Sequence, residues 1–204
     1  QPGYLVIKNN SESPALSFNF DFFSENQQYI KLYIPDGDYD YIRAGSSNSS
    51  ITFEDVSAVN EIGADCRNGS ITFKNVSADY VFALTTNSKA GMENVDADKL
   101  KIETTNGKIE LKNVNASTVS ASTSNGEIVL NNVDIDTSLE AKTSNSSIKA
   151  VFAGESGDYS YDVKTSNATI TIDDEKYGTK YSGGSGNATV TLKTSNGNVT
   201  VDYK

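Results

Sequence analysis

Hydrophobic and polar positions alternate along most of this chain, and the phase of the alternation changes at regular intervals. A tetrapeptide similar to Thr-Ser-Asn-Gly accompanies the phase change, and its Asn recurs every 19 to 20 residues over most of the chain. The series is Asn48, Asn68, Asn87, Asn106, Asn125, Asn145, Asn167 and Asn196. A period this short predicts a repeat protein, because a unit of this size buries its apolar face only by stacking on its neighbours.

Apolar residues recur at fixed offsets from each Asn. In one repeat they are Leu100 and Ile102 before Asn106, and Ile109, Leu111 and Val114 after it. Alternation within each run is typical of a strand with one buried face, and the odd step between runs indicates a corner. The sequence therefore predicts an all-β, single-chain parallel β-helix (β-solenoid) with three short strands per coil of about 19–20 residues. We expect right-handed coiling, because parallel crossover connections have that hand.

The repeated tetrapeptide is interpreted as a structural corner rather than an active site. Asn tolerates left-handed backbone geometry, and its amide can bond to nearby backbone or to the Asn of the next coil. The Thr two residues earlier is expected to point inward, where the turn can satisfy its hydroxyl group. Gly follows the Asn in some copies, but Ser49, Ser88, Ser146 and Ala168 replace it in others, so this position does not require positive φ.

Both ends of the repeat array depart from the pattern. Residues 1–38 are predicted to form an N-terminal β cap continuous with the solenoid, and residues 39–204 to form the coils of the same structural domain. Between Asn167 and Asn196 the interval is longer, and turn-forming residues predict a hairpin-like insertion near residues 173–186. Caps are expected because the ends of a solenoid expose strand edges.

Composition removes several functional classes. The formal charge of −10 disfavours nucleic acid as a partner, since binding phosphates needs a basic surface. Histidine is absent and Cys66 is the single cysteine, which excludes Ser-His and Cys-His nucleophilic pairs and internal disulfides. No apolar run approaches the ~20 residues that span a bilayer, so direct membrane insertion by this segment is not expected.

Few residues qualify as candidate ligands, and no cofactor is expected. Asp36, Asp38 and Asp40 alternate in a turn and are a weak Ca²⁺ candidate, although calcium takes about six to eight oxygen ligands. Cys66 stands in the inward Thr column, which indicates a buried structural thiol. Arg67 beside it replaces a Thr or Ser at a corner and is expected to face solvent.

An enzyme is the main alternative from another class, because solenoids also host carbohydrate-cleaving sites. Hydrolysis of glycosides needs two carboxylates about 5–10 Å apart, and no coil shows such a pair on an outward face. Ice binding is a third class, but the outward column that contains Thr52, Glu110 and Lys149 is too mixed for a regular lattice match. The sequence therefore favours a protein without catalytic activity.

The pattern TSNGxIxLxNV, present at Thr104–Val114 and Thr123–Val133, resembles a bacterial family of domains of unknown function that is named for adhesins. The segment from Ile30 to Ile51 resembles it too, so that the likeness covers roughly residues 28–204. The resemblance implies a β-solenoid in exported or membrane-anchored envelope proteins, some of them linked to envelope stress, and brings no catalytic residues.

From these observations we expect a non-catalytic structural or interaction module, adhesin-like, whose partner is a surface protein or a glycan. The alternative is a carbohydrate-binding or carbohydrate-cleaving β-helix. The chain begins at Gln1 without Met, which suggests a mature or truncated fragment. An extracytoplasmic location is expected, either secreted or anchored through a segment that lies outside this sequence.

Overall fold

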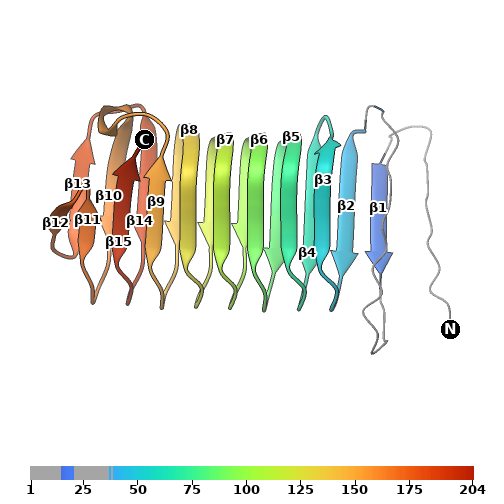
Figure 1. Cartoon of the computed structure of the whole chain (residues 1–204), viewed down its shortest axis with the longest axis horizontal. Coiled ribbons are helices and arrows are strands. Elements are labelled where there is room, and N and C mark those ends of the chain that lie inside the picture. Colours follow the sequence, from blue (N-terminus) through green and yellow to red (C-terminus); the bar gives the residue numbers. More distant parts are fainter. Residues whose placement is uncertain (1–14, 21–36, 38) are drawn as a thin grey trace.

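The computed structural model describes residues 15–20, 37 and 39–204, and they form one elongated all-β rod (Figure 1). Within these ranges there is no α-helix, and the only helical element is the 3₁₀ turn η1 (Ser156–Asp158). Parallel strands of successive coils lie side by side along the rod. The structure thus confirms the predicted β-solenoid.

The described strands fall into a regular series followed by shorter ones near the C-terminus. In chain order they are β1 (Ala15–Phe20), β2 (Tyr41–Ser46), β3 (Ile51–Ser57), β4 (Glu61–Cys66), β5 (Ile71–Thr85), β6 (Ala90–Glu103), β7 (Ile109–Ser122), β8 (Ile128–Lys142), β9 (Ile148–Phe152), β10 (Tyr159–Lys164), β11 (Ile170–Ile172), β12 (Glu175–Tyr177), β13 (Lys180–Gly184), β14 (Ala188–Lys193) and β15 (Val199–Tyr203). Strands β5 to β8 contain 14 or 15 residues each.

Three changes of side-chain phase divide each coil, as the sequence pattern predicts. In the coil that contains β7, consecutive outward-facing pairs interrupt the alternation at Lys112–Asn113, Ser117–Thr118 and Ser124–Asn125. The buried residues between them are Ile109, Leu111, Val114, Ala116, Val119, Ala121 and Thr123. The predicted short strands merge into one long strand, because hydrogen bonds to the next coil continue around two of the three corners.

The inward columns stack in register, so the core is a set of ladders of like side chains. Ile109 pairs with Ile128, and Ile128 pairs with Ile148, and each of the three is 0% exposed. Parallel strands lie about 4.8 Å apart, so each such side chain contacts its equivalents in the coils on both sides. The free energy of burial is therefore spread evenly along the rod.

At the C-terminal end, the coils do not follow chain order. Strand β14 lies between β8 and β10, and β15 lies between β9 and β11, with parallel pairing on both sides. In Figure 1 the dark red β15 stands between β9 and β11. The coil that comes last in the sequence is therefore next to last in space, and the corner Asn196 lies between Asn145 and Asn167.

Residues 173–186, where the sequence predicts a hairpin-like insertion, contain β12 and β13. Both strands run antiparallel to the last coil, β12 along β11 and β13 along β10. Asp173 and Asp174 form the turn into β12 with φ of 50° and 62°, the geometry of a tight two-residue hairpin. Short antiparallel strands thus cover edges that could otherwise pair with another chain.

Aromatic rings fill the core of the last coils. Phe152, Tyr159 and Tyr161 pack with ring centroids 5.0 to 6.4 Å apart, and Tyr203 lies 6.4 Å from Tyr161. Tyr161 stands in a column that holds Val190 in the neighbouring coil, and Tyr159 in a column that holds Ala188. The side chains of these two columns are therefore larger in the last coil than in the coil before it.

At the other end of the rod, β1 pairs in parallel with β2 and extends the ladder by one strand. Of the predicted N-terminal cap over residues 1–38, the remaining positions apart from Gly37 lie outside the described residues.

Candidate functional site

The eight Asn residues of the predicted corner ladder lie in one line along the rod. Each side-chain Nδ2 donates a hydrogen bond to the Oδ1 of the Asn in the preceding coil, with N–O distances of 2.7 to 2.9 Å. In spatial order the ladder is Asn48, Asn68, Asn87, Asn106, Asn125, Asn145, Asn196 and Asn167. Because every bond points the same way, the amides polarise one another along the rod.

The Thr column beside this ladder joins the coils from inside. Each Thr Oγ1 donates to the carbonyl of the residue that follows the Asn in the neighbouring coil, over 2.8 to 3.1 Å. Thr104 Oγ1 also accepts from the backbone N–H of Gly107 at 3.1 Å. Buried hydroxyl groups need such partners, so the inward Thr is satisfied as expected.

Cys66 takes the place of Thr in this column and is buried, 1% exposed. Its Sγ donates to the carbonyl of Ser49 at 3.2 Å and accepts from the N–H of Gly69 at 3.0 Å. The thiol therefore makes the two contacts that a Thr hydroxyl makes in other coils. Arg67 beside it is exposed, and its backbone carbonyl accepts from Thr86 and Asn87.

The corner Asn residues do not adopt the left-handed geometry that Asn tolerates. Positive φ occurs instead at a second column, seven residues after each of the first five corner Asn residues, where φ lies between 51° and 58°. Its members are Asp55, Asn75, Asn94, Asn113 and Asn132, joined by amide hydrogen bonds of 2.6 to 3.1 Å. Sequence reasoning missed this second ladder, although its signal is visible as the Asn or Asp directly before each Val of the third run.

Glycine follows the corner Asn for a steric reason. Gly107, Gly126 and Gly197 have no positive φ, in agreement with the sequence argument. A Cβ at these positions would lie 1.7, 1.7 and 1.9 Å from a carbonyl oxygen of the neighbouring coil. Ser88 and Ser146, which carry a side chain at the equivalent position, are half-buried, whereas the glycines are buried.

The proposed calcium ligands are only partly described. Asp36 and Asp38 lie outside the described residues, and Asp40 Oδ1 accepts from Asn60 Nδ2 at 3.4 Å. Over residues 15–20, 37 and 39–204, no three His, Cys, Asp or Glu side chains are grouped to hold a metal ion. The calcium site thus stays a sequence prediction.

Lys and Glu side chains pair across coils on the outward face of strands β6 to β9. Lys108 Nζ lies 2.8 Å from a carboxylate oxygen of Glu110 and 3.3 Å from one of Glu127, while Lys149 lies 2.8 Å from Glu127. The ammonium of Lys108 lowers the pKa of Glu110, and Lys149 lowers the pKa of Glu127. Exposed pairs contribute little stability each, so this face is best described as a solvated surface of balanced charge.

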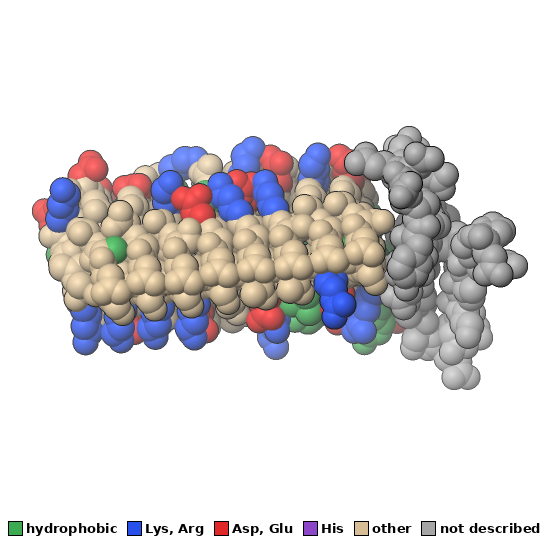
Figure 2. All heavy atoms as spheres, turned by 90° about the horizontal axis from the view of Figure 1, so that it is seen from below, with side chains coloured by type: hydrophobic (Ala, Val, Ile, Leu, Met, Phe, Trp, Pro, Cys, Tyr) green, Lys and Arg blue, Asp and Glu red, His purple; other side chains and the backbone are tan. Residues whose placement is uncertain are grey.

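Uncharged residues form a different surface at the corner ladder. Figure 2 shows the rod from below Figure 1, with a band of uncharged polar atoms along its length and Lys, Arg, Asp and Glu side chains on both sides. The band consists of the exposed Ser, Thr and Asn residues of the tetrapeptides. The rod thus presents long faces of distinct chemistry.

One outward region breaks the polar pattern. This aromatic patch consists of Tyr41, Tyr80 and Phe82 together with Arg43, whose guanidinium carbon lies 6.0 Å from the ring centroids of Tyr41 and Phe82. The Tyr80 and Phe82 rings are 5.5 Å apart. Gly63 lies directly beneath Phe82, where a Cβ would come within 2.0 Å of the ring. Glycine thus allows the ring to lie against the sheet.

Arg43 is fixed over this patch by Glu61. Both guanidinium Nε and Nη2 donate to the Glu61 carboxylate, the second over 2.9 Å, and the hydrogen bond raises the pKa of Arg43. Glu61 is 9% exposed, which makes it the least exposed carboxylate among the described residues. The pair holds a planar cation between two aromatic rings.

The Toastrack DUF4097 family matches residues 1–202, which is almost the whole chain. The chain belongs to this family. Its description assigns a domain of unknown function, and the match includes residues 1–27, which the sequence resemblance leaves out. Comparison with curated proteins and with solved structures yields no match.

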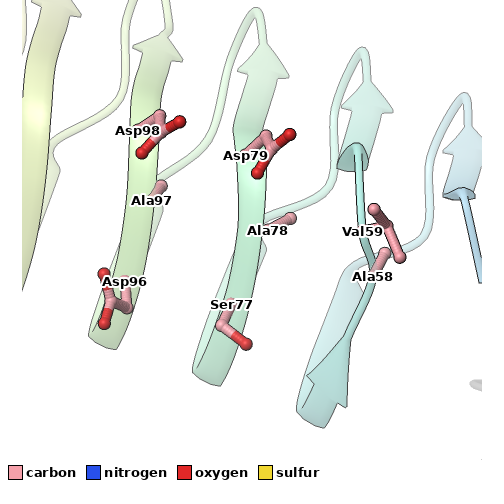
Figure 3. A pocket seen from close by; sticks show the side chains of 8 residues that line it. All are labelled: Ala58, Val59, Ser77, Ala78, Asp79, Asp96, Ala97 and Asp98. Atoms are coloured by element: carbon pink, nitrogen blue, oxygen red, sulfur yellow. The ribbon is translucent and has the colours of Figure 1, made fainter. Parts of the chain in front are cut away.

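The Toastrack rod is hollowed at the corner that corresponds to Ser117–Thr118 in the coil of β7. A shallow depression of ≈ 270 Å³ is lined by the eight residues shown in Figure 3, which include Asp79, Asp96 and Asp98. The carboxylates point outward from two neighbouring coils, and Ala78 and Ala97 form the floor. Small residues at this corner explain the depression.

Among the described residues of this Toastrack chain, no helix is long and apolar enough to cross a membrane.

Proposed function

We propose that this Toastrack rod is a non-catalytic structural or interaction module of a bacterial envelope protein, adhesin-like and located outside the cytoplasm. The observation that carries the proposal is the pair of side-chain ladders, one from Asn48 to Asn167 and one from Asp55 to Asn132, which together with the backbone ladders tie the described coils into one body. A protein built this way is stiff along its axis and repeats the same corner chemistry from coil to coil. Such a body suits display or spacing of other domains and recognition of an extended partner.

The long faces support a partner that lies along the rod. The corner band is uncharged, whereas the face of β6 to β9 carries paired Lys and Glu side chains (Figure 2). A surface protein of complementary shape could contact several coils at once, and many weak contacts at a fixed spacing would add up. The formal charge of −10 disfavours a nucleic acid in that role.

Carbohydrate binding is the second candidate, and the aromatic patch favours it. Tyr41 is 37% exposed and lies beside Arg43, with Glu61 between it and Tyr80, so an apolar surface adjoins charged hydrogen-bonding groups. Sugar rings have one apolar face and a rim of hydroxyl groups, and this combination matches both. No other described outward region combines rings with a paired arginine.

Location and partner class can be tested together on the full-length protein. Protease added to intact cells should digest a tagged Toastrack domain without lysis, since an extracytoplasmic domain is accessible. Protection until lysis would overturn the envelope proposal.

The carbohydrate alternative needs a matched pair of variants. Purified protein is tested on an array of envelope and host glycans, with Tyr41→Ala as the test and Val59→Ala as the control. Val59 is the other large exposed hydrophobic residue of the described chain, 52% exposed, and lines the depression shown in Figure 3. Binding lost in Tyr41→Ala alone supports the aromatic patch as a glycan site, whereas turnover of any glycan refutes the non-catalytic assignment.

A further inference from the structure

The coil of residues 187–204, here called the inserted coil, occupies a slot between two other coils. Its strands β14 and β15 pair with β8 and β9 on one side and with β10 and β11 on the other. Residues 153–186 pass over this slot and form the last coil of the rod and its antiparallel cover strands. The chain then returns into the slot.

The slot is specific for a coil of this sequence. Val190, Leu192, Val199 and Val201 are each 0% exposed within it. At the corner, Thr194 Oγ1 donates to the carbonyl of Ser146, and Asn196 joins the amide ladder on both sides. A residue larger than glycine at position 197 would meet the Ser146 carbonyl. An occupant must therefore supply these residues at these offsets.

The connection into the slot is glycine-rich. Residues 182–186 read Ser-Gly-Gly-Ser-Gly, here called the hinge, and lead from the last residues of the cover strand β13 toward β14. Gly184 has φ of 82°, and Gly186 packs against the backbone of Asp158 and accepts a hydrogen bond from Ser160 Oγ at 2.6 Å. Ser185 and Gly186 line an open hollow of ≈ 400 Å³ together with Gly157 and Ile135, so the hinge lies at the surface, where its glycines allow other backbone paths. Fully extended, five residues span roughly 17 Å.

We propose that the inserted coil is exchanged between two copies of this chain, so that the coil of each copy fills the slot of the other. A second copy is the occupant that the slot fits, because it supplies the same side chains and the same ladder bonds. Closed and exchanged forms then differ only at the hinge and in the entropy of association, the usual situation in domain swapping. The inference does not depend on the proposed function.

Two single-cysteine chains test the exchange. Glu140 on β8 pairs in register with Thr191 of the inserted coil on one side and with Ser120 of β7 on the other. In a Cys66→Thr background, Glu140→Cys protein is mixed with Thr191→Cys protein at high concentration, incubated, and treated with a short thiol-specific crosslinker. The matched control mixes Glu140→Cys with Ser120→Cys, since β7 cannot be exchanged.

Exchange predicts a linked dimer in which position 140 of one copy is joined to position 191 of the other, several-fold more abundant than the dimer linked between positions 140 and 120. Double variants carrying both substitutions on one chain show that each pair lies within reach of the reagent. Equal, low yields of the two mixed dimers, with efficient linking in both double variants, would overturn the proposal.

Hinge length gives an independent measurement on the otherwise unchanged chain. Deletion of Gly183 and Gly184 should prevent a chain from filling its own slot and shift the protein from monomer to dimer in light scattering. Insertion of four Gly and Ser residues should shift it back. A shortened variant that folds and stays monomeric would also contradict the exchange.

Discussion

The two Asn ladders look alike in sequence but differ in backbone geometry, and substitutions can separate the two roles. Asn113 has φ of 51° and makes amide hydrogen bonds of 3.0 and 3.1 Å to the coils on either side. Asn106 makes equivalent bonds of 2.8 and 2.7 Å without positive φ. Replacing each Asn by Ala and by Gly gives four variants, all of which lack the side-chain amide hydrogen bonds. The backbone contribution to stability should favour Gly over Ala at position 113 and Ala over Gly at position 106.

The expected magnitudes follow from two effects. Loss of two exposed hydrogen bonds costs about 1–2 kcal/mol of unfolding free energy at either position, taking the lower part of the usual range. At position 113, Ala adds left-handed strain of about 1–2 kcal/mol, whereas Gly adds only its unfolded-state entropy of about 0.5–1 kcal/mol. Asn113→Ala should therefore be less stable than Asn113→Gly by roughly 0.5–1 kcal/mol.

At position 106 the order should reverse. Ala adds no left-handed strain there, so Asn106→Gly should be the less stable variant by about 0.5–1 kcal/mol. Urea unfolding followed by circular dichroism gives all four free energies under one condition, with the slope checked for constancy. If the Ala and Gly variants had the same order of stability at positions 106 and 113, left-handed backbone strain could not be specific to the second ladder.

Three further outcomes follow from the geometry of the core. Leu111→Ala should cost about 2–5 kcal/mol in urea unfolding, because Leu111 is 1% exposed within a stacked column; a near-neutral result would contradict the ladder core. Gly126→Ala should cost about 1–3 kcal/mol through contact with the Gly107 carbonyl, whereas Ser146→Ala, at a position that already carries a Cβ, should be nearly neutral; equal effects would refute the steric explanation. Burial raises the pKa of Tyr159 to about 12, so stability should hold below pH ~10 and fall as the pH rises toward 12, since the unfolded phenol ionises first; a melting temperature that is constant over this window would contradict it.

The inward columns could be predicted from the sequence because they recur at a short period and accept only a narrow range of side chains. Positions such as Ile109, Ile128 and Ile148 tolerate only apolar side chains, since each is enclosed by its equivalents in both neighbouring coils. The corner Thr was predictable for the same reason. A hydroxyl group at an inward position needs a partner, and the turn beside it is the nearest source.

The geometry of the corners could not be predicted from residue type alone. Asn suits an amide ladder and a left-handed turn equally well, and both corners carry Asn. In the structure the left-handed residue is the one that the ladder pairing skips on both strands, as at Asn94 and Asn113, so that the two coils turn this corner together and stay in register. The aromatic patch was missed because it needs Phe82, Gly63 and Arg43 from three different coils.

The order of the last coils was hidden for a deeper reason: the columns that define a coil are the same in all of them. Val190 pairs with both Leu139 and Tyr161, and nothing in the alternation distinguishes a coil at the end from one in the middle. What distinguishes them is bulk. Within the described part of the chain, Tyr161 has a buried hydroxyl group without a hydrogen-bond partner, an arrangement tolerated where the core closes against Phe152 and Tyr203. In two columns the coil that ends the rod carries larger side chains than the inserted coil, Tyr161 where the inserted coil has Val190 and Tyr159 where it has Ala188, and this difference in size accompanies the return of the chain into the slot.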